Sequence, residues 1–87
     1  MIYDWYKIFN LDEFIATGLR SRTYTLELEE IGQKDILVTR ANLYSILYDG
    51  IFLPISLNDK NPFEFEGHAV YLDSNNDVFL GIAVDET

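Results

Sequence analysis

The sequence contains no cysteine, two prolines and a single histidine, His68. Without cysteine there can be no disulfide and no thiolate metal site, and small secreted domains usually need such cross-links. No apolar run approaches the roughly 20 residues that span a bilayer, and the first residues lack the basic and apolar segments of a signal peptide. These absences predict a cytoplasmic protein, or one that is incorporated into a particle assembled in the cytoplasm.

Positive charge is scarce and unevenly distributed along the chain. Residues 1–40 hold seven acids and five bases, whereas residues 41–87 hold eight acids and one base, Lys60, and the net charge is −9. An acidic half repels nucleic acids and anionic membranes and suits a basic protein surface. We therefore expect a protein partner, which could be a second copy of the chain, and we expect neither nucleic acid nor membrane as a partner.

Apolar and aromatic residues, in contrast, are abundant. Hydrophobic residues make up 48% of the 87 residues, and six Tyr, six Phe and one Trp are among them. Such a chain can bury a core, and its length fits one small domain, residues 1–87, with no linker or repeat. Some of the aromatic side chains are expected to remain at a surface.

One short helix is predicted near the N-terminus. Asn10 is a suitable N-cap because Glu13 follows three residues later, as in a capping box. Gly18 is a natural stop for the helix. The aromatic segment before Asn10 is compatible with either an edge strand or an extension of the helix.

The remainder of the chain has the pattern of β-strands. Alternation in 22–30 places Tyr24 and its i+2 neighbours on one face, and a turn around residues 31–33 leads to a strand over 35–40. Asp49-Gly50 between two apolar runs predicts a type I′ hairpin, in which Tyr48 faces Ile51 and Tyr44 faces Ile55.

One further short strand and a hairpin complete the prediction. After a polar loop over 58–62, the alternation in 63–66 indicates a short strand, and 68–72 and 78–84 form a final hairpin in which Val70 faces Leu80. The predicted fold class is mainly β: an antiparallel meander of about five to six strands forming a small barrel or a sandwich, with one short N-terminal helix.

No motif in the sequence predicts catalysis, a cofactor or a metal. The pattern Asp73-x-Asn75-x-Asp77 resembles the start of a calcium loop, but Val78 and Val84 stand where that loop needs Gly and Glu. Asx-rich hairpin loops are the commoner explanation. A lone His68 without a neighbouring nucleophile is more often structural. The Glu27/Glu29 and Glu64/Glu66 pairs are interpreted as solvated strand faces rather than as acid–base pairs. We therefore expect a protein that is not an enzyme.

Both predicted hairpins carry apolar residues on both faces, so part of this surface is a candidate for partner binding. The alternative is that the helix and the aromatic N-terminal segment cover it. Oppositely charged groups could frame such a surface, with arginines facing the acids of a neighbour. The candidate partner-binding residues are Leu47, Phe52, Tyr71, Phe79, Glu64, Glu66, Arg20, Arg22 and Arg40.

Two segments resemble a known class of proteins. The runs are Asp4-Trp5-Tyr6-Lys7-Ile8-Phe9-Asn10 and Asn58-Asp59-Lys60-Asn61-Pro62-Phe63. They are similar to segments of short proteins encoded among the structural genes of tailed bacteriophages. The resemblance implies a virion or morphogenesis component without a catalytic role, in a bacterial host cell, and it assigns no site residues.

Two functions remain open from the sequence. The first is an assembly or interaction module whose apolar surface meets either a different protein or another copy of the chain. The second is an acidic inhibitor, for example an anti-defence or anti-nuclease protein, whose carboxylates imitate nucleic acid and occupy a basic cleft. A carboxylate face without apolar neighbours would favour the inhibitor, whereas an exposed apolar patch would favour the assembly module.

Overall fold

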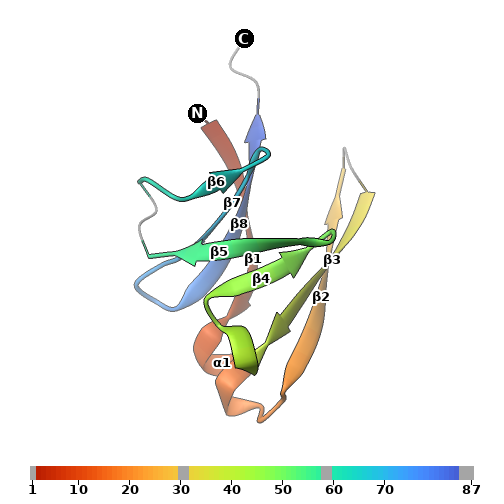
Figure 1. Cartoon of the computed structure of the whole chain (residues 1–87), viewed down its shortest axis with the longest axis vertical. Coiled ribbons are helices and arrows are strands. Elements are labelled where there is room, and N and C mark those ends of the chain that lie inside the picture. The colour runs from red at the N-terminus through yellow and green to blue at the C-terminus, as the bar shows by residue number, and fades with distance from the viewer. Residues whose placement is uncertain (1, 30–31, 58–59, 85–87) are drawn as a thin grey trace.

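The computed structural model describes residues 2–29, 32–57 and 60–84, which form a nearly closed, barrel-like β-sheet with one short helix (Figure 1). The fold is mainly β, as predicted, but these residues form eight strands rather than five or six. The strands are β1 (Ile2–Asn10), β2 (Ser21–Leu28), β3 (Gly32–Thr39), β4 (Ser45–Tyr48), β5 (Ile51–Ser56), β6 (Glu64–Phe65), β7 (His68–Leu72) and β8 (Asp77–Val84), and the helical segments are α1 (Leu11–Ala16) and the 3₁₀ turn η1 (Arg40–Asn42).

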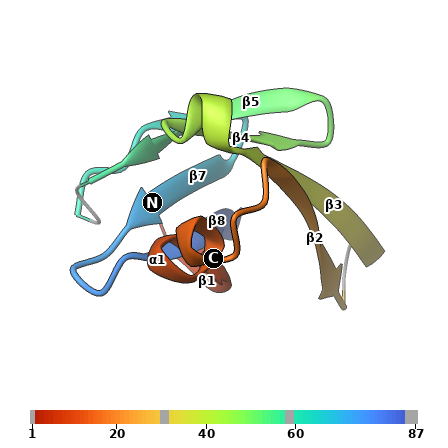
Figure 2. The ribbon, with the colours of Figure 1, turned by 90° about the horizontal axis from the view of Figure 1, so that it is seen from below.

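The strand order is β1-β8-β7-β5-β4-β3-β2, with β6 added beside β7. The sheet is therefore not the simple antiparallel meander that the sequence predicted. The short β6 carries the chain back before β7, so β7 runs parallel to β5. Strand β5 joins the two parts of the sheet, because its first residues pair with β4 whereas Ile55 and Ser56 pair with β7. Figure 2 shows the β2–β3 hairpin on one side and β7 and β8 on the other, with β4 and β5 across the top.

The aromatic N-terminal segment forms an edge strand, which is one of the two alternatives left open by the sequence. Strand β1 pairs antiparallel with β8 along its whole length, apart from a register shift between Lys7 and Phe9. Helix α1 follows directly. The predicted cap is confirmed, because the Asn10 side chain accepts a hydrogen bond from the Glu13 amide. Gly18 has a φ of +75° beyond the helix end, a conformation that glycine adopts without a steric penalty.

The two predicted hairpins have the expected registers. Asp49 and Gly50 have φ values of 48° and 80°, as a type I′ turn requires, and Tyr48 pairs with Ile51. Val70 pairs with Leu80 across the final hairpin. A further hairpin was not predicted: Glu66 and Gly67, with φ of 51° and 81°, connect β6 to β7.

Other local predictions need correction or cannot be compared. Gln33 belongs to β3 rather than to the turn predicted over 31–33, and the first position of that turn lies outside the described residues. The first two positions of the polar loop at 58–62 lie outside them as well. Tyr44 lies opposite Ile55, as predicted, and its carbonyl accepts a hydrogen bond from the Ile55 amide over 2.7 Å, but η1 and the turn after it delay the start of β4 until Ser45.

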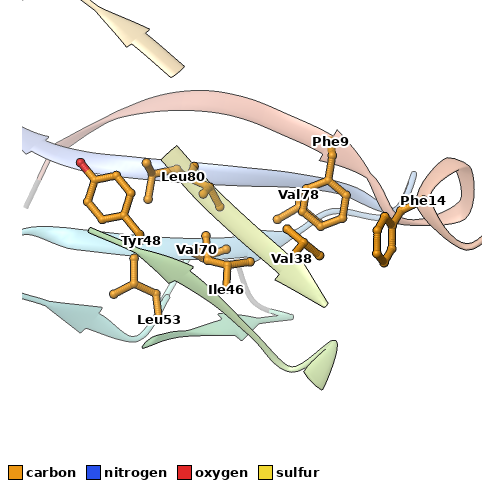
Figure 3. Close-up of a cluster of buried hydrophobic side chains, with 10 residues drawn as sticks. Phe9, Phe14, Val38, Ile46, Tyr48, Leu53, Val70, Val78 and Leu80 are labelled. Carbon is orange, nitrogen blue, oxygen red and sulfur yellow. The ribbon is translucent and has the colours of Figure 1, made fainter. Parts of the chain in front are cut away.

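The hydrophobic core lies on the inner face of the curved sheet (Figure 3). Helix α1 contributes Phe14, which is 1% exposed. Among the described residues no polar or charged residue is fully buried, so burial of apolar area is the main stabilising contribution. The core consists of Phe9, Phe14, Ile36, Val38, Ile46, Tyr48, Leu53, Val70, Val78 and Leu80.

Candidate protein-interaction surfaces

The most apolar concave surface lies where η1 meets the end of β5. It is a groove of about 500 Å³, which we call the Tyr44–Leu57 groove. Tyr44 is 86% exposed and Leu57 is 81% exposed, so both side chains project into solvent. Leu43 and Ile55 pack against the core and form part of its base. The groove is lined by Leu11, Arg40, Ala41, Leu43, Tyr44, Ile55, Leu57 and Leu72.

Neither Tyr44 nor Leu57 was predicted as a partner-binding residue. Tyr44 lies between η1 and the start of β4, where its carbonyl still accepts from the Ile55 amide, and the apolar Leu57 follows directly after the end of β5. An apolar residue at a strand end beside a polar loop is a signal that could have indicated Leu57. The exposure of Tyr44 depends on η1, and no glycine or proline in residues 39–45 would have predicted a turn there.

The three candidate arginines lie near α1. The Arg40 amide donates to the Arg20 carbonyl over 2.8 Å, so these two residues are neighbours. The Arg40 guanidinium also donates to the Ile15 carbonyl in α1, which satisfies a carbonyl near the helix C-terminus. The Arg22 guanidinium carbon lies 5.1 Å from the centre of the Tyr24 ring, a cation–π distance. Arg20 and Arg40 thus form a basic rim at this end of the molecule.

Leu47 and Phe52 lie side by side on the outer face of the β3–β4–β5 part, as the register predicted. They are direct cross-strand partners, and Leu37 continues the row on β3. Phe52 is 65% exposed, whereas Leu47 is only partly exposed. Lys34 and Asp49 form an ion pair of 3.5 Å on the same part of the sheet. Leu37 and Leu47 line a hollow of about 510 Å³ whose other lining residues are mostly polar, so this surface is less apolar than the Tyr44–Leu57 groove.

The other two apolar candidates, Tyr71 and Phe79, are covered in part by the N-terminal strand. Their rings stack with centroids 5.1 Å apart, and Trp5 contacts Tyr71 edge-on at 4.6 Å. The Trp5 ring also lies against Gly81, where an added Cβ would be 2.5 Å from a ring carbon. Glycine is therefore the residue that permits this approach. Tyr71 and Phe79 belong to a half-buried aromatic cluster, in agreement with the alternative that the N-terminal segment covers them.

Glu64 and Glu66 do not share a strand face. Strand β6 contains only Glu64 and Phe65, and Glu66 lies in the turn with a positive φ. The Glu64 carboxylate accepts a hydrogen bond from the Gly67 amide. Burial raises the pKa of Tyr3, and the negative charge of Glu64 raises it further. The prediction of paired carboxylates on one face is wrong here because the Glu66-Gly67 turn interrupts the alternation.

The remaining polar candidates have structural partners. His68 lies beside the buried Tyr48, with ring centroids 4.9 Å apart. Burial raises the pKa of Tyr48, and the adjacent Asp49 charge adds to this. In the β7–β8 loop, the Asp73 carboxylate accepts from the amides of Asn75 and Asp77, which is the geometry of an Asx-type turn. Within the described residues no group of three or more His, Asp or Glu is placed to hold a metal ion.

Comparison with known proteins found no matching family model, no matching curated protein and no matching solved structure. In the part of the chain that the structure describes, neither helical segment has the length and hydrophobicity that crossing a bilayer requires.

Proposed function

We propose that this protein is a non-enzymatic assembly module that associates with copies of itself through the Tyr44–Leu57 groove. The observation that carries the proposal is the exposure of Tyr44 and Leu57, at 86% and 81%, on a groove with an apolar base. Contiguous apolar surfaces of this kind mark interaction sites in proteins. Aromatic side chains at the centre of such a surface dominate binding energies.

A second copy is the proposed partner because the surface of the groove is complementary to itself. Projecting side chains and a hollow lie on the same patch, as a two-fold symmetric interface requires. Each copy can insert Tyr44 or Leu57 into the groove of the other. The Arg20–Arg40 rim beside the groove can meet acids of the neighbouring copy, given a net charge of −9. A stable contact must bury about 1,000 Å² or more in total, so it extends beyond the groove onto this rim.

The proposal includes a role in a tailed-bacteriophage virion or its morphogenesis. Its support is the resemblance carried by residues 4–10 and 58–63. Symmetric self-association of a small β-domain is compatible with such a role. A bacterial host cytoplasm, or a particle assembled there, is the corresponding location.

An acidic inhibitor is less well supported by the surface. That function needs carboxylates gathered without apolar neighbours. Asp4 and Glu29 instead share a cleft with the apolar Leu28 and Ile82. The most exposed apolar side chains lie in the Tyr44–Leu57 groove and not among the acids.

Light scattering of the purified protein over a range of concentrations tests the proposal. We expect the mass to rise to that of a dimer or larger oligomer, and the double variant Tyr44→Ser/Leu57→Ser to remain monomeric. Phe52→Ser is the matched control, because it removes an exposed aromatic ring from the other side of the sheet; it should leave the oligomer intact. A wild-type protein that stays monomeric at millimolar concentration, or an oligomer lost only in Phe52→Ser, would contradict self-association through this groove.

A further inference from the structure

We propose that the unclosed part of the seam between β1 and β2 binds an extended peptide segment in which basic and apolar residues stand two positions apart, on one face of the added strand. We call this part the open seam. It is a cleft of about 200 Å³ lined by Asp4, Tyr6, Leu28, Glu29 and residues 82–84. The inference does not rest on the proposed self-association, since the Tyr44–Leu57 groove shares none of these residues.

The backbone edges on either side of the open seam are long and regular. Strands β1 and β2 stand at the two ends of the strand order, and within the described residues no hydrogen-bonded ladder joins them. The pairing of β1 with β8 is regular from Ile2 to Lys7, and that of β2 with β3 is regular throughout. An edge strand presents a row of unpaired N–H and C=O groups that can template an additional strand. Peptide recognition by strand addition uses such edges.

The inner wall of the open seam is apolar and incompletely covered. Leu28 is buried, whereas Ile82, which packs against the core, and Tyr6, which pairs with the buried Leu80, are only partly buried. A cavity of about 200 Å³ is below the roughly 300–1,000 Å³ of a typical small-molecule site. The space therefore suits an apolar side chain of an added strand better than a cofactor.

The negative charge at the open seam favours basic residues in the bound peptide. Asp4 and Glu29 both line the cleft, and among the described residues neither forms an ion pair. Two lysines on neighbouring strands are engaged elsewhere: Lys7 pairs with Asp77 at 3.3 Å and Lys34 with Asp49. Asp4 lies on the same face of β1 as Tyr6, because these two residues pair with Ile82 and Leu80 on the core side of β8. In an added strand, a lysine or arginine two residues from an apolar residue would therefore meet Asp4 while the apolar side chain packs on Tyr6.

A short peptide blocked at both ends is the probe for this site, with lysine and valine two residues apart and threonine between them. We expect saturable binding by calorimetry and, in NMR spectra, shifts of the backbone amides of residues 2–6 and 26–28. A peptide of the same composition in which lysine and valine are adjacent, and so point to opposite faces, should bind several-fold more weakly, as should a peptide with glutamate in place of lysine. Equal binding of the peptide with adjacent lysine and valine, or amide shifts confined to other strands, would overturn the proposal.

Matched variants separate specific recognition from the general attraction of a basic peptide to an acidic protein. Asp4→Asn/Glu29→Gln should weaken binding by about three- to tenfold, as expected from the loss of two exposed ion pairs. Asp12→Asn/Glu13→Gln removes the same charge from α1, beyond the other end of β1, and should change affinity by less than about twofold. The Tyr44→Ser/Leu57→Ser variant should bind the peptide as the wild type does. Loss of binding in that variant would place the peptide in the groove and refute the open seam as its site.

Discussion

The two ends of the seam between β1 and β2 differ in how they are closed. At the end next to α1, which we call the bridged end, Phe9 stacks on Tyr24 with ring centroids 5.0 Å apart. Phe14 from α1 packs edge-on against Phe9, and a surface hollow of about 310 Å³ lies over them. At the other end, the open seam has Asp4 and Glu29 on its rim. In Figure 1 the β2–β3 hairpin leans away from β1 toward the end where β1 begins.

The difference shows that side-chain packing rather than strand pairing closes this barrel. The bridged end is held by aromatic rings because α1 supplies Phe14 across it. No helix stands over the open seam among the described residues, and the side chains there are a carboxylate pair and half-buried apolar groups. The same two strands therefore contribute stability at one end and leave backbone and carboxylates accessible at the other.

Truncation of Phe14 is expected to show the largest difference in stability between a substitution at the bridged end and one at the open seam. Phe14→Ala should lower the free energy of unfolding by about 3–5 kcal/mol, because it leaves a cavity at a fully buried position. Tyr6→Ala in the open seam should cost roughly 1–2 kcal/mol, because Tyr6 is only half-buried. Denaturant unfolding of both variants measures the contrast. If Phe14→Ala does not fold, Phe14→Leu should still show a loss of about 1 kcal/mol. Equal losses at the two ends would show that α1 does not close the barrel.

A smaller effect is expected from Asn10, which connects the bridged end to the β7–β8 loop. Its side chain caps α1 and donates to the Asn75 carbonyl and to the Asp77 carboxylate. Asn10→Ala should lower the free energy of unfolding by about 1 kcal/mol, as for other N-cap losses. Asn42→Ala, which removes one exposed side-chain bond to Ser45, is the matched control and should cost less than about 0.5 kcal/mol.

The Asn10 substitution also has an expected pH dependence. The hydrogen bond from Asn10 lowers the pKa of Asp77, and Lys7 lowers it further. A carboxyl whose pKa is lowered by folding stabilises the protein above its unfolded pKa, and this contribution is lost as the pH falls through the folded pKa. The difference in stability between wild type and Asn10→Ala should therefore shrink in acid. A difference that grows below about pH 4 would contradict the assigned role of Asn10.

Local sequence signals predicted the elements that depend on neighbouring residues. The Asn10 cap, the Asp49-Gly50 turn and the register of the final hairpin each follow from residues a few positions apart. The pairing of Ile2 with Val84 and the parallel contact of Ile55 with Val70 were not predicted. They join segments whose adjacency is set by packing of the whole chain, and no local pattern encodes it.

The candidate surfaces were predicted less completely for the same reason. Leu47 and Phe52 were placed correctly because their hairpin register is local. The partial cover of Tyr71 by Trp5 depends on the pairing of β1 with β8, and the exposure of Tyr44 depends on η1. Both are tertiary or conformational features that alternation alone does not reveal.

Native-state hydrogen exchange tests most directly whether the seam is bridged at one end and open at the other. At the bridged end the Leu11 amide donates to the Asn76 carbonyl over 2.8 Å, and it should exchange only through large unfolding events, as should the central amides of β7 and β8. The amides of residues 2–6 and 26–28 that face the open seam should exchange near the rate of an unstructured chain. Protection of those amides equal to that of Leu11 would show that the seam is closed along its length and would contradict this account.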